Sequence, residues 1–65
     1  MIDEIGDAAG KVWTYLNANG EVTTAKLIRD VACTRDLAQR AIGWLAREGK
    51  VHLEKKERVE TIRLA

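Results

Sequence analysis

The spacing of the apolar residues changes once along this 65-residue chain, at Gly49. Before Gly49 they recur every three or four positions, which is the period of an amphipathic helix. After it, Val51 and Leu53 alternate with polar residues, and so do Ile62 and Leu64, which is the period of a strand. A chain that places its helices first and two paired strands last is expected to fold as an α+β domain.

Capping residues divide the first part of the chain into three helices. Asn19-Gly20 and Gly49 supply left-handed helix ends, while the hydroxyls of Thr23 and Thr34 are suitable N-caps. The second and third helices are separated by about three residues, which is typical of a helix-turn-helix. We predict helices near residues 3–18, 24–31 and 35–48, with boundaries uncertain by about two to four residues.

The last part of the chain predicts an antiparallel hairpin over about residues 50–64. Its two strands are separated by the polar run 54–58, which lacks the Asn-Gly or Asp-Gly of a tight turn. Val59 is out of phase with Ile62, so we expect a bulge or a longer wing tip there. Earlier in the chain, Glu21-Val22 is long enough only for a single bridging strand.

The length allows one domain over residues 1–65 with a single thin core. With one cysteine, Cys33, and one histidine, His52, the chain can build neither an internal disulfide nor a closed zinc site. We expect Cys33 to be a buried, unreactive thiol and His52 to be exposed. No apolar run approaches a membrane span, and the acidic N-terminus is unlike a signal peptide, so the expected location is cytoplasmic, with no membrane partner.

The net charge of +1 conceals an asymmetry. Residues 1–21 have a net charge of −3 and residues 22–65 a net charge of +4. An anionic ligand is therefore expected to meet the C-terminal part of the chain.

Several segments of the sequence resemble a known family. The stretch 41–51 is similar to the junction between third helix and wing in the winged helix-turn-helix superfamily. A narrower resemblance, to a family of small stand-alone prokaryotic winged-helix proteins formerly classed as a domain of unknown function, rests on Ile5-Gly6, 9–13, Leu16-Asn17 and 43–47. It implies three helices and a C-terminal two-stranded wing. Members of the superfamily mostly bind duplex DNA, although many of its domains bind only protein.

The third helix has a polar arc opposite its apolar side. At about 100° per residue, this arc holds Arg35, Asp36, Gln39, Arg40, Gly43 and Arg47. In a DNA-binding winged helix such an arc enters the major groove, where Arg pairs with guanine and Gln with adenine. An ordinary solvated helix face has the same composition, and Asp36 would repel phosphates.

The wing contains basic residues interleaved with Glu54, Glu57 and Glu60. Its cations are suited to phosphate or minor-groove contacts, but the pattern equally fits a solvated edge that discourages aggregation. The candidate nucleic-acid-binding residues are Arg35, Gln39, Arg40, Arg47, Lys55, Lys56 and Arg58.

No common catalytic constellation is present in the sequence. It has no serine, no Gly-rich phosphate loop and no paired metal-ligand motif. We therefore expect no enzyme activity, no cofactor and no small-molecule ligand.

Trp13 and Trp44 allow two interpretations: both belong to the core, which is the commoner case, or they form a ligand or partner surface. The third helix is apolar over an arc of about 160°, and the first helix spreads its apolar residues over more than one stripe. We accordingly expect a homodimer, with a monomer whose Trp44 is fully covered as the alternative. The two functional hypotheses are a DNA-binding, transcription-regulating module and a protein-interaction or dimerisation module.

Overall fold

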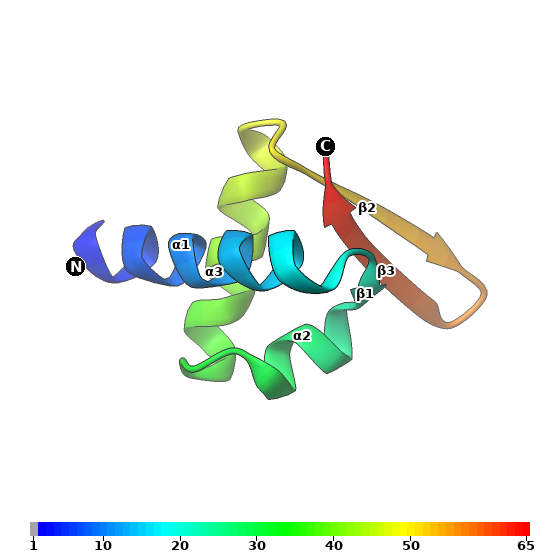
Figure 1. Ribbon diagram of the computed structural model, residues 1–65, viewed down its shortest axis with the longest axis horizontal. Coiled ribbons are helices and arrows are strands. Elements are labelled where there is room, and N and C mark those ends of the chain that lie inside the picture. Colours follow the sequence, from blue (N-terminus) through cyan, green and yellow to red (C-terminus); the bar gives the residue numbers. More distant parts are fainter. Residues whose placement is uncertain (1) are drawn as a thin grey trace.

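The computed structural model describes residues 2–65, with side chains from Glu4 onward. The elements are α1 (Ile2–Asn19), β1 (Val22–Thr23), α2 (Thr24–Asp30), α3 (Arg35–Arg47), β2 (Val51–Lys56) and β3 (Val59–Leu64). Figure 1 shows α3 crossing behind α1, with the β2–β3 hairpin extending to one side of the helices. The predicted α+β winged helix, with three helices followed by a C-terminal hairpin, is confirmed.

The predicted capping residues set the helix boundaries. Thr23 and Thr34 each accept a hydrogen bond at Oγ1 from the backbone N–H three residues later, at 3.1 and 3.2 Å. Each bond satisfies a donor that the first turn of a helix leaves free. Gly20 and Gly49 follow α1 and α3 with φ of +73° and +72°, a conformation that glycine adopts at no steric cost.

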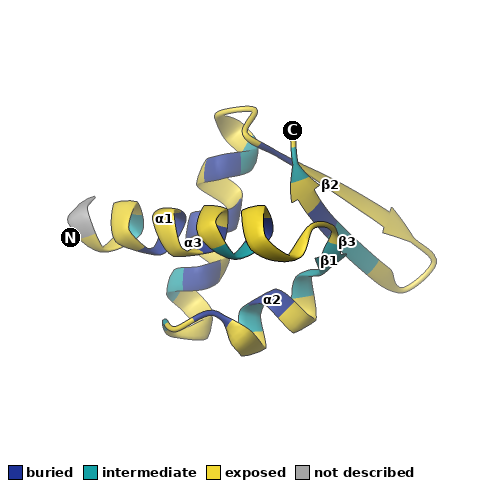
Figure 2. Cartoon of the chain, viewed as in Figure 1, coloured by how far each residue is buried: buried dark blue, intermediate teal, exposed yellow. Residues whose placement is uncertain are grey.

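The core lies where α1, α2 and α3 meet one face of the sheet (Figure 2). Its largest fully buried side chains are Val12 and Leu16 of α1, Leu27 of α2 and Ile62 of β3. β3 is the central strand of the antiparallel order β1-β3-β2. It packs against α1 and α2, so Ile62 is fully buried at the middle of the sheet. The bridging strand expected at Glu21-Val22 lies one residue later, in β1.

The hairpin has a shorter turn and longer strands than the sequence predicted. Its register is regular from the Val51–Leu64 pair to the Lys56–Val59 pair, so the expected bulge near Val59 and the expected loop over residues 54–58 are both wrong. Only Glu57 and Arg58 form the turn. Strand pairing uses backbone groups, and an exposed hairpin accepts charged side chains, so the polarity of residues 54–56 indicated exposure and not a loop. Because successive side chains alternate, Val59 faces away from the side occupied by Ile62.

Neither tryptophan is a core residue. Trp13 and Trp44 are 44% and 45% exposed, which corrects the commoner interpretation of these two residues. The helices approach each other through small side chains such as Ala8, Ala9 and Ala41, all buried, and this close approach leaves the indoles at the rim. Cys33, which was expected to be buried, is half-buried in the turn before α3, where it packs against the core.

Candidate nucleic-acid interface

All residues of the predicted polar arc of α3 are exposed. We call this arc the arginine face; it consists of Arg35, Asp36, Gln39, Arg40, Gly43 and Arg47. On the opposite side of the helix, Ala38, Ile42 and Leu45 pack into the core. The core therefore fixes the rotation of α3 about its axis and turns the arginine face to solvent.

The arginines of this face have no ionic partner among the side chains of residues 4–65. Over residues 4–65, ion pairs of 4.0 Å or less involve only Lys26 and Arg29 with Asp30, and Lys56 with Glu54. Asp36 is on the arginine face but binds neither Arg35 nor Arg40 within that distance. The guanidinium groups are thus free to bind an external acceptor.

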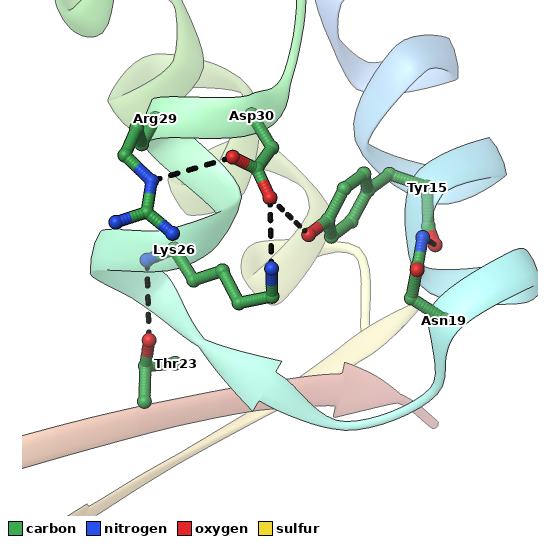
Figure 3. A network of polar contacts seen from close by, with 6 residues as sticks. All are labelled: Tyr15, Asn19, Thr23, Lys26, Arg29 and Asp30. Atoms are coloured by element: carbon green, nitrogen blue, oxygen red, sulfur yellow. Dashed lines mark hydrogen bonds and ion pairs between the residues drawn. The ribbon is translucent and has the colours of Figure 1, made fainter.

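The basic side chains of α2, unlike the arginines of α3, bind a carboxylate of their own helix (Figure 3). The Asp30 carboxylate accepts hydrogen bonds from the Tyr15 hydroxyl at 2.9 Å and from Lys26 Nζ at 3.0 Å, and Arg29 Nε approaches it at 3.4 Å. These donors hold the pKa of Asp30 at about 2, below its ordinary value of 3.8, with the Lys26 hydrogen bond the largest cause. The network offsets part of the positive charge of α2 and connects it to α1, so we assign it a structural role.

The wing places its cations in two groups. Lys55 and Arg58 line a shallow groove together with Thr23 and Thr24, at the start of α2. Lys56 lies on the opposite face of the hairpin from Lys55, where its side chain is 82% exposed and Glu54 Oε2 lies 4.0 Å from its Nζ. An exposed pair at that distance contributes little.

The structure thus brings together some of the predicted site residues and not others. Arg35, Gln39, Arg40 and Arg47 share one face of one helix. Lys55 and Arg58 instead adjoin the start of α2. Sequence reasoning identified Thr23 only as a cap and did not identify Thr24, because the proximity of α2 to the wing depends on the pairing of β1 with β3.

Neither a metal site nor a membrane span is found in the part of the chain that the structure describes. No three His, Cys, Asp or Glu side chains there are grouped so as to hold a metal ion. No helix there is both long and apolar enough to cross a bilayer.

Comparison with known proteins places the fold in a family. Residues 1–64 match the model of a family described as "Winged helix-turn-helix domain (DUF2582)". The chain belongs to this family. Members of winged-helix families are typically not enzymes. The family assignment agrees with the resemblance in the sequence and with the order of elements in the structure.

Two relatives of this winged-helix domain match almost all of its length. It is 34% identical to "Uncharacterized protein MJ1608" of Methanocaldococcus jannaschii over 67 residues, covering 98% of this chain and 94% of that protein. The solution NMR structure of protein BT2368 from Bacteroides thetaiotaomicron has a TM-score of 0.82 and 37% identity, covering 95% of this chain and 76% of that one. The likeness to the solved structure supports the fold.

Proposed function

We propose that this domain binds duplex DNA through the arginine face of α3 and the tip of the wing. The observation that supports the proposal is that Gln39, Arg40 and Arg47 are all exposed on one side of α3, and that neither arginine makes an ion pair within residues 4–65. Helix packing does not need these side chains, since the core contacts lie on the other side.

The chemistry of this face suits the edges of base pairs. An α-helix with its side chains is about 10–12 Å across and fits the major groove, which is about 12 Å wide. Inside it, Arg donates two hydrogen bonds to guanine, and Gln pairs with adenine. Arg40 and Arg47 lie about two turns apart and would reach neighbouring base pairs or their phosphates.

The groove between wing and α2 adds candidate phosphate contacts. Lys55 and Arg58 provide the charge, and the hydroxyls of Thr23 and Thr24 are nearby. Such contacts set position and carry no sequence information. A small winged-helix domain that binds DNA suits transcriptional regulation, which is the role we propose.

The charge of this surface predicts weak, salt-sensitive binding. Asp36 opposes phosphate on the arginine face, and Gly43 provides no side chain there. We expect a dissociation constant in the range typical of non-specific complexes, about 10⁻⁴ to 10⁻⁶ M at physiological salt, with a salt slope of about 0.9 for each phosphate neutralised.

Three matched single substitutions test the proposal by fluorescence anisotropy with a mixed-sequence duplex. Arg40→Ala and Arg47→Ala should each lower the affinity about fivefold or more and reduce the salt slope by about 0.9. Arg63→Ala is the control, because it removes the same charge from an exposed position at the end of the hairpin away from the turn. It should change the affinity less than about twofold.

Two results would contradict the proposal. One is the absence of any anisotropy change with the unsubstituted protein at low ionic strength. The other is an equal loss for Arg40→Ala, Arg47→Ala and Arg63→Ala, which would show only a dependence on net charge. Circular dichroism of each variant establishes that it is folded.

A further inference from the structure

A second surface lies beside the arginine face, where α1 crosses α3. Trp13 and Trp44, each nearly half exposed, line one groove together with Gly6, Gly10 and Lys50. We call this surface the tryptophan groove. Large apolar side chains exposed together on a small protein usually mark an interaction site, and aromatic residues are enriched at the centres of protein interfaces.

Two of the residues that line the tryptophan groove, Gly6 and Gly10, are glycines that the fold itself does not need. No atom lies within 4 Å of a Cβ built at Gly6 or at Gly10, and neither residue has the positive φ seen at Gly20. Glycine in a helix interior is less favourable than alanine. A helix with two glycines one turn apart, beside exposed indoles, suits close approach by the backbone of a second helix.

Charges at two separate places on the molecule favour a second copy of this chain as that partner. Lys50 lines the groove and Arg47 is three residues after Trp44, whereas Glu4 and Asp7 lie in the early turns of α1 outside the groove, with Asp7 in a separate pocket. Within residues 4–65 none of these four charges forms an ion pair. A two-fold contact repeats each interaction, so the acidic start of each α1 can meet the basic side of the other copy's groove.

We propose that the tryptophan groove is the interface of a two-fold homodimer, with the two α1 helices crossing at Gly6 and Gly10. The contact is small, below about 1,200 Å² in total, which is the range of weak and transient complexes. The inference concerns self-association alone and does not depend on whether the domain binds DNA.

The decisive variant is the double substitution Gly6→Ala with Gly10→Ala, studied by sedimentation equilibrium without DNA. In the monomer the added methyl groups meet open space, so the melting temperature of dilute protein should rise by about 4 °C or more. In the dimer the same methyl groups separate the crossing helices, so the dissociation constant should increase at least tenfold.

Gly43→Ala is the matched control. This glycine also has open space around it, but it lies on the arginine face and not in the groove. Its substitution should raise the melting temperature and leave the dissociation constant unchanged. Lys50→Glu should weaken association as well, because it reverses the charge that faces the acidic start of the partner helix.

Two outcomes would overturn the proposal. The first is a purely monomeric mass for the unsubstituted protein at several hundred micromolar, with tryptophan emission that does not shift with concentration. The second is a dimer whose dissociation constant is unaffected by the double alanine substitution, or affected equally by Gly43→Ala. The gain in thermal stability keeps the test valid, since a variant that is better folded cannot lose the dimer through unfolding.

Discussion

At the scale of the residue, Asp30 shows how one carboxylate connects two helices. It accepts a hydrogen bond from Tyr15 of α1 and one from Lys26 of its own helix, at 2.9 and 3.0 Å (Figure 3). Charge-assisted hydrogen bonds of this kind stabilise the ionised form of the acceptor. The same contacts raise the pKa of Lys26, chiefly through the hydrogen bond to Asp30.

The lowered pKa of Asp30 makes its contribution to stability depend on pH. A carboxylate whose pKa falls on folding stabilises the folded state above its unfolded pKa. This contribution is therefore present at neutral pH and is lost as the pH falls from 3.8 towards about 2. Carboxyl NMR titration should place the midpoint of Asp30 near 2, and Tyr15→Phe should raise it. A midpoint at 3.8 that does not respond to Tyr15→Phe would contradict this account.

At the scale of the element, helix positions were predictable and the wing turn was not. The helices follow from short-range information: caps at Thr23 and Thr34, and glycine ends at Gly20 and Gly49. The hairpin turn has no such local code, because Glu57 occupies a left-handed position, φ +57°, that a turn of this length usually gives to glycine or asparagine. The pairing of β2 with β3 therefore holds the turn in a conformation that glutamate by itself disfavours.

Replacing Glu57 with glycine should therefore stabilise the folded protein. In a left-handed conformation a side chain costs about 1–2 kcal/mol, of which the greater flexibility of unfolded glycine offsets a part. We expect Glu57→Gly to raise the free energy of unfolding by about 0.5–1 kcal/mol in urea denaturation. Arg58→Gly is the control: its φ is not positive, so glycine there should be neutral or destabilising. The reverse order of stability would show that the turn is not the one described.

In the whole molecule, one part of the candidate site could be predicted from the sequence, and the other part follows only from the packing of distant segments. The arginine face was predictable, because its residues lie on one helix and the helical period alone places them together. The groove between the wing and α2, and the meeting of Trp13 with Trp44, join residues about 30 positions apart. Their proximity depends on the sheet register and on the close α1–α3 crossing, which no local pattern specifies.

The proposed DNA-binding surface combines the arginine face with the wing tip. Amide chemical-shift mapping of the labelled protein, titrated with duplex at low salt, tests it most directly. The largest shifts should occur at Gln39, Arg40 and Arg47 and around the Glu57–Arg58 turn, and they should disappear at high salt. The absence of shifts at saturating duplex, or shifts confined to residues 6–13, would contradict it.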